Sequence, residues 1–495
     1  MAKVLLINPN KWGRGITPIW IPSHAAVLNS KGHQVSLFDC TFYKDWSVNE
    51  IVYNTENKQY KSSDYDNYIE WKDGVYQDLA EKISNYKPDI IFISAISSHI
   101  HGEGEYVNIQ YGHDLLEKIN LPIDTMTVAG GLQPTASPET MFDKFPKIQY
   151  FIRGESEFVL GDIVDNFRDE SKLESLNGLV YKNDAGQVII NKPQEIISNM
   201  DEIPPYDYSL FEEQIFYRPY NGKVVKAVDY ELSRGCIYTC SYCVETVIQK
   251  YYGFTEKKKN GMLAKANYYL RCKSAKRVYE EIKYLHQNFG VILFRCQDTN
   301  FLTIKNDVLQ ELATLIENDN NLENICLYIE TRPEGINHAS INLLKRLKVD
   351  GVGMGVELAA DDFRESNLNR YSTKENIINA FDLLKKAGIR RTSYNIIGLP
   401  GQDEKMILDT IIFNQGLHPD NMTVAFYSPY IGTEQQQKAK EENYFDDYEY
   451  HVDGQLRSVT KSTLVSVETL NFYKKNFIKL VTEGIEQLEK LKEQG

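Results

Sequence analysis

The sequence predicts an α/β protein built from two successive series of parallel β-strands, with a helix between most neighbouring strands. Three observations lead to this prediction. Short apolar runs recur along the chain and end in small or polar residues, amphipathic stretches lie between them, and a proline-rich break divides the runs into two groups. The 495 residues amount to roughly three domains of ordinary size, which also indicates more than one domain.

The first series occupies about residues 1–205 and predicts a doubly wound, Rossmann-like sheet. Its expected strands are 3–7, 34–38, 89–94, 125–129 and 149–152. A helix is expected over about 21–31, a polar insertion over 44–78, and a small hairpin over 176–195. In such sheets ligands bind beyond the carboxyl ends of the strands, so the residues that follow each strand are the candidate binding residues.

The second series covers about residues 226–433 and predicts a partial barrel. A linker is expected over 195–225, because Pro204-Pro205 interrupts the pattern. The expected strands are 227–232, 291–295, 325–330, 351–356, 392–397 and 422–426. They form six βα units, fewer than the eight of a closed barrel. The remaining residues, 434–495, carry a charge-mixed amphipathic pattern and are expected to form a helical C-terminal region.

Composition excludes several classes of protein. The chain has 42% hydrophobic and 25% charged residues, which is ordinary for a globular protein and unlike a disordered or collagen-like one. With 55 basic and 69 acidic residues the net charge is −14, so a generally basic, nucleic-acid-binding surface is not expected. No apolar run approaches the length of a membrane span, and the N-terminus has no signal-peptide pattern. A cytoplasmic protein is therefore expected.

Three closely spaced cysteines carry the strongest chemical signal. Cys236, Cys240 and Cys243 lie in the run SRGCIYTCSYC, directly after the first strand of the second series. Iron–sulfur clusters are held by such thiolates, and three thiolates leave one iron of a four-iron cluster open to a chelating molecule. A structural zinc site needs a fourth ligand. Cys272 is the nearest other cysteine and has no paired ligand beside it, so incidental or zinc-binding cysteines are the weaker interpretation.

This loop resembles the signature of the radical S-adenosylmethionine (SAM) enzymes, including the aromatic Tyr242 before the last cysteine. The resemblance implies a 4Fe-4S cluster, with SAM bound to its open iron and cleaved to a 5′-deoxyadenosyl radical. Further candidate SAM-binding residues follow successive strands: Asp298, Arg332, Glu357 and Gly398. Charged side chains there suit the carboxylate, amine and ribose of SAM, and a glycine lets the backbone approach a flat ring.

The first series resembles the cobalamin-binding domain that precedes the barrel in one class of these enzymes. The candidate residues are Asn8, Pro9, Trp12, Ser94, Ser97, Gly130, Gly131, Arg153, Gly154 and Glu155. Small residues at strand ends suit a flat corrin ring, although a nucleotide-binding or purely structural domain is an alternative. The loop after the first strand has no histidine, so we expect a bulky side chain such as Trp12, and not an imidazole, below the cobalt. The rival ligands are His99, His101 and His113.

Taken together, the resemblances imply a cobalamin-dependent radical SAM methyltransferase that methylates an unactivated carbon through a 5′-deoxyadenosyl radical and methylcobalamin. A cyclase, ring-rearranging or oxidising enzyme with the same cofactors is the alternative, and a non-catalytic corrinoid carrier or sensor is a minor one. The expected partners are a small-molecule, lipid-precursor or peptide substrate and a reductant such as flavodoxin or ferredoxin. A nucleic-acid substrate is not expected, because no basic RNA-binding module follows the barrel.

Overall fold

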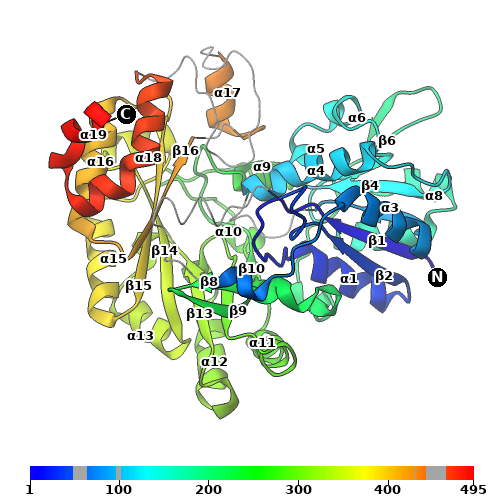
Figure 1. Ribbon diagram of the computed structural model, residues 1–495, viewed down its shortest axis with the longest axis horizontal. Helices are drawn as coiled ribbons and strands as arrows, with labels where there is room; N and C mark the ends of the chain where they lie inside the picture. The colour runs from blue at the N-terminus through cyan, green and yellow to red at the C-terminus, as the bar shows by residue number, and fades with distance from the viewer. Residues whose placement is uncertain (48–63, 96–101, 428–429, 442–463, 495) are drawn as a thin grey trace.

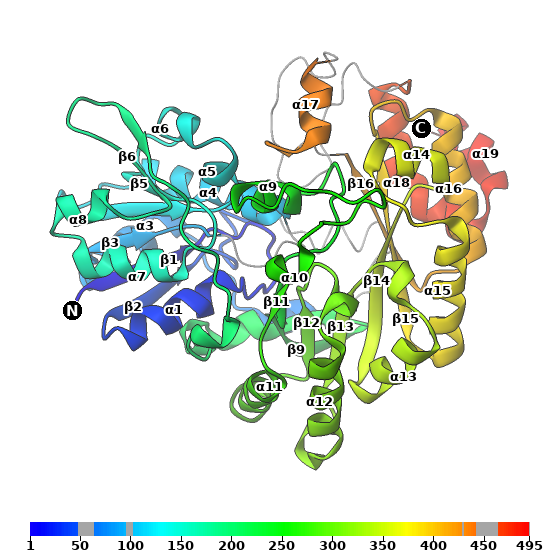
Figure 2. The same cartoon turned by 180° about the vertical axis from the view of Figure 1, so that it is seen from behind.

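Two seven-stranded sheets lie side by side, the N-terminal one in blue to cyan and the C-terminal one in green to orange (Figure 1). The computed structural model describes residues 1–47, 64–95, 102–427, 430–441 and 464–494. Helices cover both faces of the N-terminal sheet and the outer face of the C-terminal sheet, as the view from behind also shows (Figure 2). The predicted α/β fold class, with a doubly wound sheet followed by a partial barrel, is confirmed.

The N-terminal sheet has the order β2-β1-β3-β4-β5-β6-β7. Its parallel strands are β1 (Lys3–Asn8), β2 (Gln34–Asp39), β3 (Ile90–Phe92), β4 (Met126–Gly130) and β5 (Tyr150–Ile152). The order reverses between β1 and β3, which is where a doubly wound sheet opens a ligand crevice at its carboxyl edge. The hairpin expected over 176–195 is present as β6 (Leu179–Lys182) and β7 (Val188–Ile190), and it extends the sheet in the antiparallel sense.

Strand β1 shows why these apolar runs become central strands. Val4 and Leu6 belong to one buried hydrophobic cluster, and Leu5 and Ile7 belong to another on the opposite face. A strand covered on both faces needs apolar residues at every position, since neighbouring side chains point to opposite sides. The helices that provide the cover are α1 (Trp20–Ser30), α3 (Val75–Tyr86), α4 (Gly102–Glu117), α5 (Leu132–Ala136), α6 (Met141–Lys144), α7 (Glu157–Asn166) and α8 (Glu170–Glu174).

The C-terminal sheet has the order β16-β15-β14-β13-β12-β9-β8. Its six parallel strands are β9 (Lys223–Tyr230), β12 (Leu293–Cys296), β13 (Cys326–Glu330), β14 (Val349–Glu357), β15 (Arg390–Ile397) and β16 (Asn421–Phe426), as the sequence predicts. The outer helices include α11 (Ala275–Phe289), α12 (Asn306–Glu317), α13 (His338–Arg346), α14 (Asp361–Leu368), α15 (Lys374–Ala387) and α16 (Glu404–Leu417).

The expected linker over 195–225 is only partly a linker. Residues Tyr217–Tyr220 form β8, which pairs antiparallel with β9 and makes the edge of the C-terminal sheet. The sequence does not predict this strand, because Pro219 interrupts it. Proline has no amide hydrogen to donate, so in a sheet it is tolerated mainly in an edge strand, where the amide has no neighbouring strand to pair with. Short 3-10 helices occupy much of the preceding stretch.

The predicted C-terminal helix is present as α18 (Val467–Glu483), which packs on α16 and β16. Leu470, Tyr473, Phe477 and Leu480 form its buried stripe, each 3% exposed or less. The flanking helices are α17 (Glu434–Glu441) and α19 (Leu488–Gln494). Within the described ranges, no helix combines the length and the apolar character that a bilayer crossing requires.

Candidate functional site

The three-cysteine loop follows β9 and is held on two sides, once before its first thiol and once between its first two thiols. The short strand β10 (Ser233–Arg234) pairs antiparallel with β11 (Arg271–Cys272). On the other side, the amide of Thr239 donates to the carbonyl of Gly261 over 2.9 Å, and the amide of Leu263 donates to the carbonyl of Ile237 over 2.8 Å. The loop is therefore held by neighbouring chain before any ligand binds, and α9 (Glu245–Tyr251) follows it directly.

The thiols are placed where a cation would stabilise them. Cys236 and Cys240 are each 7% exposed, and Cys243 is half-buried. Burial raises the pKa of Cys236 to about 12, with further contributions from the Glu245 and Cys240 charges. Buried thiols crowded in this way become thiolates only if positive charge compensates them, which a bound iron cluster provides. The donor set and its spacing in the sequence therefore fit an iron–sulfur cluster.

Two arginines lie beside these thiols. Arg332, after β13, donates from Nη1 to Cys240 Sγ over 3.5 Å, and its guanidinium lies 3.7 Å from the ring centre of Tyr238. Arg370, in the loop after α14, donates from Nη2 to the carbonyl of Gly355 over 2.7 Å. The sequence prediction includes Arg332 but misses Arg370, because Arg370 does not follow a strand and no motif marks it.

Tyr242 and Glu357 meet at the same edge. The Tyr242 hydroxyl donates to Glu357 Oε1 over 3.0 Å, and Arg370 Nη1 lies 3.6 Å from the same oxygen. Glu357 has a backbone φ of +60°, a left-handed conformation that is uncommon outside glycine. The structure therefore brings two predicted strand-end residues, Arg332 and Glu357, and the predicted loop residue Tyr242 close to the thiols.

Asp298 and Gly398, the other two predicted strand-end residues, lie outside this charged group. Asp298 is fully buried and accepts hydrogen bonds from the amides of Leu232 (3.1 Å) and Ser233 (2.6 Å), so it fixes the start of the cysteine loop from behind. Burial raises the pKa of Asp298 to about 7. Gly398 has a φ of +79° and donates to Gln402 Oε1 over 2.8 Å, beside a small apolar cluster against which Tyr242 packs. That cluster places apolar side chains next to the charged group.

The concave face of the C-terminal sheet is polar and partly open. Alternate residues of β13 face the outer helices and are buried, whereas Tyr328 and Glu330 are only half-buried. Tyr394 of β15 donates to Glu330 Oε1 over 2.8 Å and lies 2.9 Å from the Tyr328 hydroxyl. Gly353 makes the room, since a Cβ there would lie 2.5 Å from the Tyr394 hydroxyl. Burial raises the pKa of Glu330 to about 7. The sequence prediction includes none of these residues.

At the N-terminal sheet, the residues after β1 are engaged with their own domain. The side-chain Nδ2 of Asn8 donates to Asp39 Oδ2 over 3.0 Å, and Trp46 Nε1 donates to the Pro9 carbonyl over 3.2 Å. Trp12 is half-buried in the same loop, and its amide donates to Asn10 Oδ1 over 3.0 Å. This loop is therefore ordered by contacts of its own at the carboxyl end of β1.

The ends of β3 and β4 offer a setting that fits a large flat ligand. Ser94 is fully buried, and its hydroxyl has no hydrogen-bond partner among the described residues. A Cβ on Gly131 would lie 3.3 Å from that hydroxyl, and one on Gly130 would lie 3.2 Å from the Ser94 carbonyl oxygen. Buried polar groups are almost always satisfied, so this hydroxyl points to a ligand or water. Ser97 lies outside the described residues.

The predicted turn Arg153-Gly154-Glu155 lies at the junction with the C-terminal sheet. The Arg153 guanidinium lies 4.6 Å from the ring centre of Tyr251 in α9. A Cβ on Gly154 would come within 2.5 Å of both Tyr251 Cε1 and Tyr252 Oη. Glu155 is 5% exposed and accepts from Arg271 Nη1 over 2.7 Å. The Glu155 side chain therefore binds Arg271 at this junction.

Behind the cysteine loop, the same junction carries a buried ion network. Arg234 is 1% exposed, and its Nη2 lies 2.5 Å from Glu157 Oε1 and 2.7 Å from Glu231 Oε1. Its Nη1 lies 3.6 Å from Glu155 Oε1. Glu155 and Glu157 belong to the N-terminal sheet and its helices, whereas Arg234 lies two residues before Cys236. Charged contacts thus connect the end of β5 to the cysteine loop.

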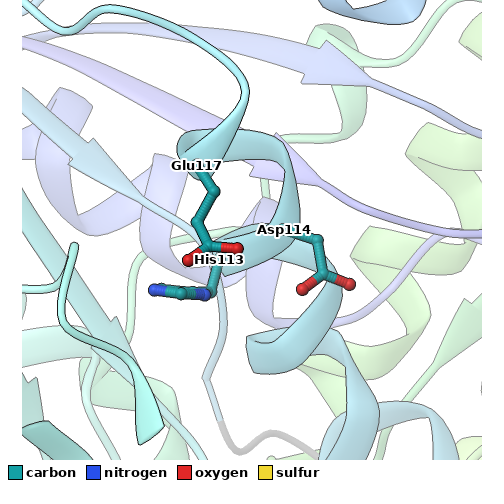
Figure 3. A group of neighbouring side chains, drawn as sticks. All are labelled: His113, Asp114 and Glu117. Atoms are coloured by element: carbon teal, nitrogen blue, oxygen red, sulfur yellow. The ribbon is translucent and has the colours of Figure 1, made fainter. Parts of the chain in front are cut away.

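Of the candidate cobalt-ligating histidines, His99 and His101 lie outside the described residues. His113 lies in α4 with Asp114 and Glu117, and their potential ligand atoms are all within 4.8 Å of one another (Figure 3). The Lys147 amide donates to His113 Nε2 over 3.4 Å, just before β5 begins. That position is at the amino edge of the sheet, so the proposal of His113 as a cobalt ligand at the carboxyl edge is wrong.

Comparison with known proteins gives a consistent result. Residues 230–413 match the family described as the radical SAM superfamily. An anaerobic magnesium-protoporphyrin IX monomethyl ester cyclase of Rubrivivax gelatinosus is 24% identical over 440 residues, covering 86% of this chain and 68% of that protein. An uncharacterized methyltransferase of Pyrococcus horikoshii is 26% identical over 362 residues, covering 73% of this chain and 72% of that protein.

Two solved structures share the fold over most of this chain. The radical SAM methyltransferase TsrM from Kitasatospora setae, with cobalamin and a [4Fe-4S] cluster bound, superposes with a TM-score of 0.62 at 16% identity, covering 89% of this chain and 78% of that one. The cobalamin-dependent SAM radical enzyme OxsB, with aqua-cobalamin and SAM bound, gives a TM-score of 0.56 at 16% identity, covering 90% of this chain and 55% of that one.

Proposed function

We propose that this chain, which belongs to the cobalamin-binding radical SAM enzymes, is a methyltransferase that methylates an unactivated carbon of its substrate. One observation carries the proposal. A three-thiol loop with two arginines lies at the carboxyl edge of the barrel sheet, and the small residues Ser94, Gly130 and Gly131 lie at the carboxyl edge of the neighbouring doubly wound sheet. The buried network of Arg234 joins the two edges, so the two proposed cofactor sites would belong to one unit.

The cluster and SAM would be held by the charged group described above. Cys236, Cys240 and Cys243 would ligate the 4Fe-4S cluster. Glu357, oriented by Tyr242, suits the amino group of SAM, and Arg332 or Arg370 suits its carboxylate, through charge-assisted hydrogen bonds. The apolar cluster near Gly398 suits the adenine ring. Asp298 would keep the loop in position.

Cobalamin would bind at the carboxyl edge of the N-terminal sheet. Ser94, Gly130 and Gly131 would approach it closely, and the Asn8-Pro9 loop would place Trp12 at its lower face. When bound, the cluster with SAM supplies a 5′-deoxyadenosyl radical and the cobalamin supplies the methyl group. The chain's own task is to orient these groups and exclude water. Paramagnetic resonance of the Co(II) form tests the lower face: hyperfine splitting from a bound imidazole nitrogen would contradict the placement of Trp12.

A cyclase or an oxidising enzyme with the same cofactors is a second candidate. The match to a cyclase along 86% of this chain favours it, and the hydrogen-bonded group of Glu330, Tyr394 and Tyr328 on the concave face would give such a reaction a proton acceptor. For either reaction we propose a small-molecule, lipid-precursor or peptide substrate and an external reductant.

The deciding experiment uses anaerobically prepared protein, a reductant, a candidate substrate and SAM carrying a deuterated methyl group. Methyl transfer predicts a product heavier by the labelled methyl group, whereas cyclisation or oxidation predicts an unlabelled product that has lost hydrogen. Formation of 5′-deoxyadenosine with no labelled product would refute methyl transfer.

Cluster binding is tested separately by iron analysis. Serine variants of Cys236, Cys240 and Cys243 should lose bound iron. Cys326→Ser, which changes a half-buried thiol outside the loop, should keep it.

A further inference from the structure

An exposed basic segment pairs with the cysteine loop of this acidic chain. Lys250, Lys257, Lys258, Lys259 and Lys265, here called the lysine face, are all exposed. Residues 249–269 contain these five lysines and a single acidic residue, Glu256, although the whole chain carries a net charge of −14. Among the lysines, Lys257 forms an ion pair with Glu434. Such a local reversal of charge creates a positive field that attracts an anionic partner.

The segment that carries the lysine face is in direct contact with the proposed cluster loop. Residues Tyr238 and Met262 form an antiparallel bridge, flanked by the hydrogen bonds of Thr239 with Gly261 and of Leu263 with Ile237. Tyr238 lies midway between Cys236 and Cys240. Paired strands are about 5 Å apart, so the lysine-bearing turn lies one chain width from the thiol loop. A partner that contacts this turn would therefore lie close to the thiol loop.

An exposed aromatic side chain lies in the same segment. Tyr268, in the short helix α10 (Ala266–Tyr269), is 75% exposed. Its neighbour Tyr269 is fully buried, and the Tyr269 carbonyl oxygen would lie 2.6 Å from a Cβ on Gly235, the residue before Cys236. Protein interfaces commonly combine an exposed aromatic anchor with surrounding charge. Figure 2 shows α9 and α10 close to the centre of the molecule, with the chain between them in green.

We propose that the lysine face, with Tyr268, is the docking surface for an acidic one-electron donor protein of the flavodoxin or ferredoxin kind. The inference rests on the proposed function, because that function requires an electron for a cluster held by Cys236, Cys240 and Cys243. The donor gives up one electron and is oxidised, the cluster accepts it and is reduced, and no bond to the donor forms. Charge complementarity sets the rate of encounter, and the short path through the Tyr238 strand serves the transfer.

The test compares two donors on the full-length protein with its cluster. Reduced flavodoxin is the acidic protein donor, and photoreduced 5-deazariboflavin is a small uncharged one. The variant carries Lys258→Glu, Lys259→Glu and Lys265→Glu. The control carries Lys345→Glu, Lys385→Glu and Lys386→Glu, the same change of charge near the ends of α13 and α15, at the amino edge of the sheet.

We expect the lysine-face variant to slow flavodoxin-driven formation of 5′-deoxyadenosine at least about tenfold at low salt, and the control to slow it less than about twofold. The deazariboflavin-driven rate should stay unchanged in both. For the unaltered protein, the flavodoxin-driven rate should fall as salt is added, because salt screens exposed charges. The single neutral variant Lys259→Gln should show a smaller loss in the same direction.

Three results would overturn the proposal: an unchanged flavodoxin-driven rate in the lysine-face variant, an equal loss in the control, or a proportional loss with deazariboflavin. The last result would make the lysines part of the SAM or substrate site and not a docking surface. Failure of the proposed function gives a different pattern, because the unaltered protein would then form no 5′-deoxyadenosine with either donor.

Discussion

Replacement of Glu157 by glutamine tests how much the buried ion network of Arg234 contributes to the free energy of unfolding. The side chains of Glu157 and Arg234 are 0% exposed and meet at 2.5 Å. Burial alone would raise the pKa of Glu157, but the Arg234 guanidinium outweighs it and, with His24, brings the pKa down to about 2 from an ordinary 4.5. Since each pKa unit corresponds to about 1.4 kcal/mol, the ionised Glu157 contributes about 3 kcal/mol to the free energy of unfolding at pH 7.

The sign of the pH dependence follows from the lowered pKa. A carboxylate with a lowered pKa stabilises the folded chain above the pKa of the unfolded state, and this contribution declines as the pH falls toward the folded value. We therefore expect Glu157→Gln to cost about 3 kcal/mol at pH 7 and about 1 kcal/mol near pH 3. The amide keeps the shape of the side chain, so packing changes little.

The assay is equilibrium unfolding in urea at several pH values. All four tryptophans lie within the first 71 residues, so tryptophan fluorescence reports on the N-terminal part of the network, while far-ultraviolet circular dichroism reports on the whole chain. The matched control is Glu81→Gln, an exposed change in α3. A Glu157 variant within about 0.5 kcal/mol of the control at pH 7, or a difference that does not shrink at low pH, would refute the reasoning.

Three other predictions follow from single contacts. Gly154→Ala should destabilise the chain by at least 1 kcal/mol more than Gly186→Ala in urea unfolding, because both residues have a positive φ but only at position 154 would the new Cβ meet side chains of α9; equal losses would contradict this. Tyr242→Phe removes the hydrogen bond to Glu357 and should weaken SAM binding up to about tenfold in equilibrium dialysis, and unchanged affinity would exclude the contact. Glu330 has a raised pKa, so the free energy of unfolding of the unaltered chain should fall as the pH increases from about 4.5 to 7. Glu330→Gln should remove this dependence on pH, and parallel curves of unfolding free energy against pH for the two proteins would contradict the raised pKa.

The sequence predicts the strands well because central parallel strands need apolar residues on both faces, and β1 has them. It misses β8, whose edge position tolerates Pro219 and leaves no apolar signal. The sequence also does not predict that β6 and β7 extend the sheet, since it indicates a hairpin but not the strand with which the hairpin pairs.

The candidate site is predictable where chemistry and position coincide. The cysteines are close in sequence, and Arg332 and Glu357 each follow a strand, so local pattern is enough to find them. Arg370 and Tyr394 reach the site only through tertiary packing: one from a loop after a helix, the other from the middle of a strand. The role of Glu155 at the junction is hidden for the same reason, because its partner Arg271 is distant in the chain.

The left-handed backbone of Glu357 implies a compromise between durability and activity. A residue with a side chain pays about 1–2 kcal/mol for that conformation, a cost that glycine avoids. Glu357→Gly should therefore relax the end of β14 while removing the carboxylate that Tyr242 and Arg370 orient. Given the role proposed for Glu357, selection for thermal stability alone at this position would favour a variant that binds SAM less well.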